Sequence, residues 1–128
     1  MTSRSLCAVL LAFAVGIAPA AGAQDRTVTL AVPGRINANP SIAARGNFVA
    51  VAWSGTLQST QDVFVATSRD GGSNWSTPVQ VNATAGDSRV SGEQPPRVAL
   101  VPGKGAMPEI VVVWGSKGEK GTRLQSAR

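Results

Sequence analysis

Few side chains in this sequence are suited to acid–base, nucleophilic or metal chemistry. The 128 residues include no histidine and no tyrosine, and Cys7 is the single cysteine. Within this sequence, these absences exclude acid–base catalysis by histidine, metal ligation by histidine and a tyrosine nucleophile. We therefore predict no cofactor, and we expect neither a disulfide nor thiol chemistry in the mature protein.

One eight-residue stretch, Ser68-Arg69-Asp70-Gly71-Gly72-Ser73-Asn74-Trp75, places a carboxylate among turn-forming residues. The glycines predict a hairpin, because they adopt positive φ without a Cβ clash. Ser68 and Asp70 are expected to close the turn by accepting hydrogen bonds from backbone N–H groups. Trp75 is expected to pack back onto the sheet. A calcium loop is the alternative, but it needs several oxygen ligands where Asp70 stands alone, so we predict no metal.

The elements that position this turn are predicted to be strands. Short valine-rich runs bounded by Gly, Pro, Asn and Ser are typical of strands, and we expect almost no helix after the first 23 residues. The predicted strands are Thr27 to Val32, Ser41 to Ala44, Phe48 to Trp53, Val63 to Ser68, Val79 to Asn82, Arg97 to Val101, Ile110 to Trp114 and Thr122 to Ser126.

These strands form an internal repeat, which indicates a β-propeller with one blade per repeat. The matching positions lie 56, 61 and 59 residues apart: Pro40 with Pro96, Trp53 with Trp114, and Arg69 with Arg128. The two tryptophans are expected in the core between blades. The repeat predicts one complete blade, most of a second and a leading strand, with further blades needed to close the fold. A complete small β-sandwich of about seven strands is the alternative.

The turn resembles the Asp-box of sialidase-type β-propellers, Ser/Thr-x-Asp-x-Gly-x-Thr-Trp/Phe. Ser68, Asp70, Gly72 and Trp75 match this pattern, and Asn74 departs from it. The resemblance implies that residues 24–128 are the N-terminal part of an all-β, six-bladed propeller of the sialidase-like superfamily. It also implies that the box is a structural hairpin away from the substrate pocket.

The same resemblance implies an activity, hydrolysis of terminal sialic acid from glycoconjugates by an exo-α-sialidase. That family holds the substrate carboxylate with three arginines, uses an aspartate as acid/base and a tyrosine as nucleophile. Arg35-Ile36 matches the start of its Arg-Ile-Pro sequence, although Asn37 replaces the proline, so Arg35 is the candidate carboxylate clamp. Asp62 is the sole acidic residue from Ser41 to Thr67 and is the candidate acid/base; the alternative is a polar residue that opens the strand Val63 to Ser68 or caps a loop. The alternative is a non-catalytic propeller that binds a glycan or protein, inactive as this fragment.

Residues 1–23 have the pattern of a cleavable signal peptide. Arg4 precedes an apolar run from Leu6 to Ala18, and the small residues Ala21-Gly22-Ala23 form the expected cleavage site. The run is too short to span a bilayer, so we predict a secreted or periplasmic protein without a membrane anchor. The net charge is +5, but the basic residues are scattered, and we expect no nucleic-acid partner.

Overall fold

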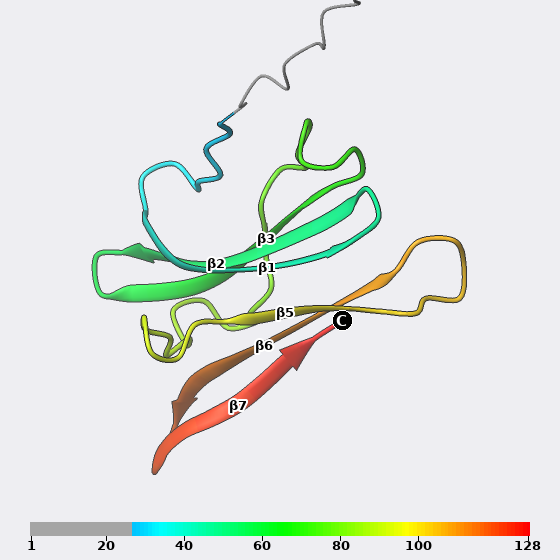
Figure 1. Cartoon of the computed structure of the whole chain (residues 1–128). Coiled ribbons are helices and arrows are strands. Elements are labelled where there is room, and N and C mark those ends of the chain that lie inside the picture. Colours follow the sequence, from blue (N-terminus) through cyan, green and yellow to red (C-terminus); the bar gives the residue numbers. More distant parts are fainter. Residues whose placement is uncertain (1–26) are drawn as a thin grey trace, which may run out of the picture.

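The computed structural model describes residues 27–128 (Figure 1). The predicted signal peptide, its cleavage site and Cys7 lie outside these residues. The described part contains strands and no helix, which confirms the predicted all-β class. Within it there is accordingly no helix of a length and hydropathy that would span a membrane.

The strands form two antiparallel sheets that lie one above the other in Figure 1. The first contains β1 (Ile36–Arg45), β2 (Phe48–Leu57), β3 (Thr60–Ser68) and β4 (Val79–Gln80). The second contains β5 (Arg97–Val101), β6 (Glu109–Gly118) and β7 (Gly121–Ala127). Within each sheet, strands that follow one another in the chain are paired, so each sheet is a meander, and none of the described strands passes from one sheet to the other.

The predicted leading strand, Thr27 to Val32, is wrong, because this segment has no strand partner. Instead of a strand, the side chain of Asn37 forms hydrogen bonds with the backbone of Val32. Its Oδ1 accepts from the Val32 N–H at 2.9 Å, and its Nδ2 donates to the Val32 carbonyl at 3.1 Å. Leu30 and Val32 pack on the outer face of the first sheet. The apolar residues of Thr27 to Val32 therefore mark side chains that pack on the sheet, not a strand that pairs with it.

Of the predicted strands that form, only β5 has the predicted bounds: β1, β2, β3, β6 and β7 are longer than predicted, and β4 is shorter. β1 begins at Ile36 rather than Ser41, and its register with β2 shifts between Ala38 and Ser41. Asn39 lies at this bulge with a φ of 56°, a conformation that asparagine tolerates better than most residues. β4 is confined to Val79–Gln80 because the Asn82 side chain, rather than a continuing strand, accepts from the Val63 N–H at 2.9 Å.

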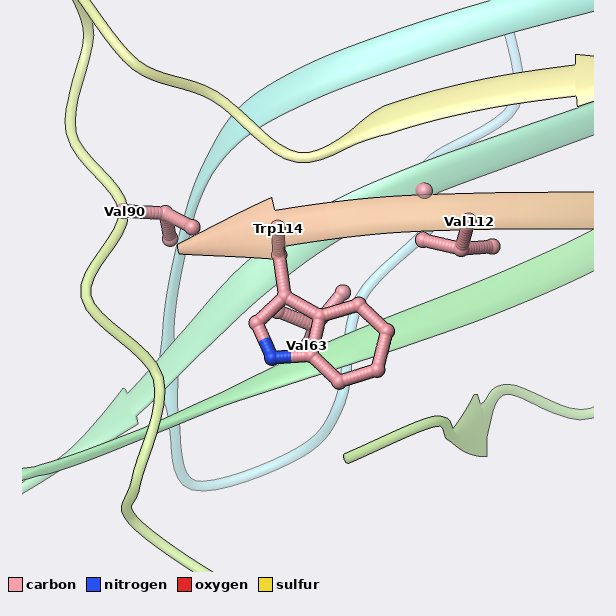
Figure 2. Close-up of a cluster of buried hydrophobic side chains, with 5 residues drawn as sticks. Val63, Val90, Val112 and Trp114 are labelled. Atoms are coloured by element: carbon pink, nitrogen blue, oxygen red, sulfur yellow. The ribbon is translucent and has the colours of Figure 1, made fainter. Parts of the chain in front are cut away.

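The two faces of the first sheet bury different side chains, because residues alternate along β2 and β3. Between the sheets lies a cluster of Ala52, Val63, Val90, Val112 and Trp114 (Figure 2). On the opposite face lies a second cluster of Trp53, Phe64 and Ala66, partly covered by Leu30, Val32, Val51 and Trp75. Of the two tryptophans expected in the core between blades, Trp114 packs between the two sheets. Trp53 lies on the other side of the first sheet.

Candidate functional site

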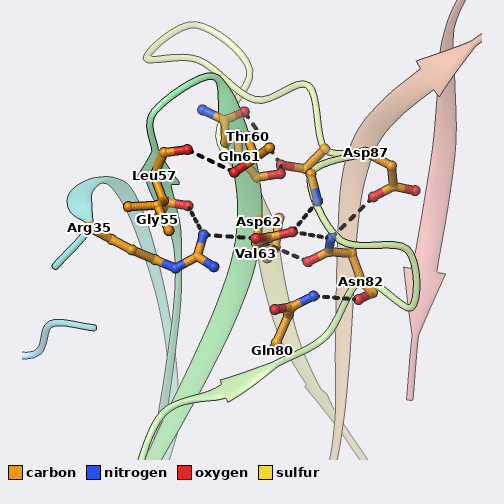
Figure 3. Close-up of polar contacts among 12 residues, drawn as sticks. Arg35, Gly55, Leu57, Thr60, Gln61, Asp62, Val63, Gln80, Asn82 and Asp87 are labelled. Atoms are coloured by element: carbon orange, nitrogen blue, oxygen red, sulfur yellow. Dashed lines mark hydrogen bonds and ion pairs between the residues drawn. The ribbon is translucent and has the colours of Figure 1, made fainter. Parts of the chain in front are cut away.

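The two residues that the resemblance singles out, Arg35 and Asp62, meet on the outer face of the first sheet. Arg35 directly precedes β1, and Asp62 is the third residue of β3, opposite Gly55 of β2. The Arg35 Nη1 donates to the Asp62 Oδ2 at 2.8 Å, forming an ion pair (Figure 3). The Arg35 side chain is 18% exposed and that of Asp62 is 1% exposed, so the pair is largely removed from water.

Neighbouring groups fix the Arg35 guanidinium in this position. Its Nη1 also donates to the Gly55 carbonyl at 3.1 Å, and its Cζ lies 5.1 Å from the centroid of the Phe64 ring. Stacking of a guanidinium on an aromatic face is favourable, more so when it is partly desolvated. A Cβ at Gly55 would lie 2.8 Å from the Phe64 ring and 3.1 Å from the Arg35 Cδ. Glycine is therefore required for this close approach.

The other Asp62 oxygen is bound by the loop that follows β4. Asp62 Oδ1 accepts from the Asn82 Nδ2 at 2.7 Å and from the Gly86 N–H. Burial opposes ionisation of this carboxyl, but the hydrogen bonds from Gly86, Asn82 and Arg35 together outweigh it and hold its pKa below the usual value. Asp62 is therefore an acceptor without a proton at neutral pH.

Asn82 links this network to the rest of the loop. Its Nδ2 also donates to the Thr84 carbonyl at 2.8 Å and to the Asp87 Oδ1 at 3.2 Å (Figure 3). Its Oδ1 holds the Val63 backbone of β3. Asp62 and Asn82 together connect the segment before β1, strand β3 and the loop after β4 by hydrogen bonds. We call this network of Arg35, Asp62, Asn82 and Gly86 the structural clamp.

The Ser68–Trp75 turn, by contrast, is closed mainly by its own residues, and one further hydrogen bond runs from the Gly71 N–H to the Asn47 carbonyl at 2.8 Å. The Ser68 Oγ donates to the Asp70 Oδ1 at 2.7 Å and accepts from the Gly72 N–H at 2.8 Å. Asp70 accepts from the Asn74 N–H at 2.8 Å and from the Asn74 Nδ2 at 2.6 Å. Gly71 and Gly72 have φ values of 71° and 96°, as the hairpin requires.

Two further features complete this turn. The Trp75 Nε1 donates to the Gly72 carbonyl at 2.8 Å, which supplies the acceptor that its indole needs. Hydrogen bonds from Asn74 and Ser68 lower the pKa of Asp70 to about 2. All four residues predicted for the box, including the half-buried Trp75, thus hold the turn together. They lie at the opposite end of β3 from Asp62.

Sequence reasoning missed Asn82, Gly86, Gly55 and Phe64. The partners of Asp62 lie 20 to 27 positions away in the chain, so no local spacing marks them. The single available signal was Asp62 itself, an isolated acidic residue at the start of an apolar strand.

Among residues 27–128 there is no group of three or more His, Cys, Asp or Glu residues arranged to hold a metal ion. Comparison of the chain with protein-family models, curated proteins and solved structures found no match.

Proposed function

We propose that the described residues form two neighbouring blades of a secreted Asp-box β-propeller of the sialidase-like superfamily. The meander within each sheet supports this proposal, because a β-sandwich of the immunoglobulin type passes strands between its sheets in Greek-key connections. Trp53 and Trp114 also lie on matching faces of their own sheets. Trp114 lies on the face of the second sheet that packs against the first sheet, and Trp53 lies on the face of the first sheet that is turned away from the second. Both tryptophans therefore point in the same direction along the stack of sheets. The turn geometry at Asp70 adds independent support.

The surface of the second sheet is consistent with further blades. The face of β6 and β7 turned away from the first sheet carries Val111, Val113 and Leu124, and Leu124 is 80% exposed. Propeller blades bury such faces against the next blade. We therefore expect this face to be covered in the closed propeller.

As its function, we propose that this propeller binds glycans without cleaving them. The observation that carries this proposal is the environment of Asp62, which is buried and hydrogen-bonded by Arg35, Asn82 and Gly86. These hydrogen bonds hold its pKa below the usual value. A general acid must hold a proton near neutral pH and reach the glycosidic oxygen. Asp62 meets neither condition, and the Arg35 Nη1 that would grip a substrate carboxylate is held by Asp62 and by the Gly55 carbonyl.

Sialidase activity is the second candidate function. It is favoured by one observation: the Arg35 Nη1 lies 2.8 Å from the Asp62 Oδ2, although 27 positions separate the two residues in the chain. For catalysis this pair would have to open, so that Asp62 could take a proton and Arg35 could bind the carboxylate of the sugar.

One pair of assays on the full chain separates these functions. We expect no release of 4-methylumbelliferone from its α-sialoside above a protein-free blank, together with measurable binding on an array of glycans. Turnover that is abolished in Asp62→Asn but kept in the exposed-site control Glu93→Gln would establish the sialidase and overturn the binding proposal.

A further inference from the structure

A pocket opens between the two sheets at the end that carries the Asp-box turn. Its walls are the β1–β2 turn and the segment that joins β5 to β6, which lie on the same side of the molecule (Figure 1, right). The pocket has a volume of about 340 Å³, within the range of roughly 300–1,000 Å³ typical of ligand sites. Neither Arg35 nor Asp62 lines it, so it is distinct from the structural clamp.

The inner surface of this pocket is the uncovered end of the core between the sheets. Residues alternate between the two faces of a strand, so Phe48 shares the inner face of β2 with Ala52 of the core. On the second sheet, Ile110 packs against the same core, and Pro108 continues its face into the pocket. Met107 also lines the pocket and is 42% exposed. An apolar group that enters here would therefore extend the core and leave water, which is favourable.

The wall formed by residues 102–108 folds back closely on itself. A Cβ at Gly103 would overlap the Met107 carbonyl oxygen and would lie 3.4 Å from the Glu109 Cγ, so glycine permits this close approach. The pairing of Val101 with Glu109 closes the segment where β5 ends and β6 begins. The pocket is therefore organised before any ligand arrives, which reduces the entropy cost of binding.

One positive charge, that of Arg45, lies at this apolar pocket. Arg45 is the last residue of β1, is exposed and pairs with Phe48 across the β1–β2 turn. Within residues 27–128 its guanidinium forms no ion pair, and Glu109, at the end of the opposite wall, is ion-paired with Arg128 at 3.3 Å. The lining includes no acidic side chain. A guanidinium in this position suits a carboxylate, which it can bind through two parallel hydrogen bonds.

We propose that this pocket binds an apolar monocarboxylate of the size of a medium-chain fatty acid, with its chain against Phe48, Met107 and Pro108 and its carboxylate on Arg45. At roughly 30 Å³ per water molecule the pocket holds the volume of about eleven waters, which suits a ligand of about ten non-hydrogen atoms. A sugar suits it less, because Arg45 has the single polar side chain among the described residues of the lining, and buried hydroxyls would lack partners. The further blade expected on the opposite face of β6 and β7 would leave the pocket open. The inference is independent of the proposed glycan binding.

The test compares three probes, octanoate, hexanoate and 1-octanol, by isothermal titration calorimetry on the full chain. Octanoate should bind about tenfold or more tightly than hexanoate, because each buried methylene changes the affinity about fourfold. It should bind about threefold or more tightly than 1-octanol, because the alcohol cannot form the ion pair with Arg45. Affinity that does not rise with chain length, or equal binding of octanoate and 1-octanol, would overturn the proposal while leaving glycan binding intact.

Variants locate the site. Arg45→Gln should weaken binding of octanoate about threefold or more and change that of 1-octanol by less than about twofold, which also shows that the variant is folded. The matched control, Arg123→Gln, removes the same charge from an exposed position at the opposite end of the sheets, and both affinities should stay within about twofold of the wild-type values. Equal effects of the two variants on octanoate would place it elsewhere, on exposed apolar surface, and would contradict the assignment. Absence of octanoate binding to the wild-type chain would also overturn the proposal.

Discussion

Asp62 and Asp70 lie at opposite ends of β3 and hold the fold in different ways. Asp62 is buried and binds groups that are 20 to 27 positions away in the chain. Asp70 is exposed, and its partners Ser68 and Asn74 lie within four positions. The comparison teaches that a similar carboxylate can either join distant segments or close a local turn, and that the sequence reveals the second more readily.

The largest expected effect comes from Asp62→Ala, which leaves the Arg35 guanidinium without its partner and the Asn82 amide and Gly86 N–H without an acceptor. Breaking one side of a buried ion pair costs about 3–5 kcal/mol. Urea unfolding of the full chain should report a loss of this size in the free energy of unfolding. A loss below about 1 kcal/mol would show that the buried clamp is no stronger than a surface pair.

Trp75→Ala should have the next largest effect, because Trp75 connects the local turn to the cluster of Trp53 and Phe64. A fully buried aromatic costs about 3–5 kcal/mol when truncated, and half-burial lowers this to about 2 kcal/mol. The thermal midpoint measured by circular dichroism should fall accordingly. Trp75→Phe keeps most of the packing and isolates the hydrogen bond to the Gly72 carbonyl, for which we expect a loss of about 1 kcal/mol.

The difference between these two regions explains which features could be predicted from the sequence and which could not. Glycine, serine and aspartate at fixed spacing determine the Ser68–Trp75 turn locally, and alternating apolar residues between turn signals determine most strands. The clamp depends on chain segments that meet only after the sheets form, so Asn82 and Gly86 carried no recognisable signal. The prediction of a strand at Thr27 to Val32 was wrong for a related reason, because its apolar residues pack on the first sheet without pairing with a strand.

Ser68→Ala should destabilise the turn less than loss of Trp75. Its hydroxyl donates to Asp70 and accepts from the Gly72 N–H, and leaving a buried donor unsatisfied costs about 1–2 kcal/mol. The matched control is Ser73→Ala in the same turn, where the side chain is exposed and the change should stay within about 0.5 kcal/mol. Equal losses in both variants would contradict the specific role of Ser68.

The smallest effect concerns pH. The pKa of Asp70 falls from 3.8 to about 2 on folding, so its stabilising contribution is complete above about pH 4 and is lost as the pH falls toward 2. Asp70→Asn should remove this part of the acid sensitivity between pH 4 and 2 and leave the part that comes from Asp62. Unfolding midpoints measured at half-unit steps of pH should therefore vary less in the variant, and an unchanged pH profile would argue against the Asp70 contacts.

The central claim is that Arg35 and Asp62 bind each other rather than a substrate. A double-mutant cycle on the full chain, with Arg35→Ala, Asp62→Ala and both together, measures this directly through the free energies of unfolding. We predict a coupling energy above about 1 kcal/mol between the two residues. Losses that add within about 0.5 kcal/mol would contradict the claim, because the two side chains would then be free to act on a ligand.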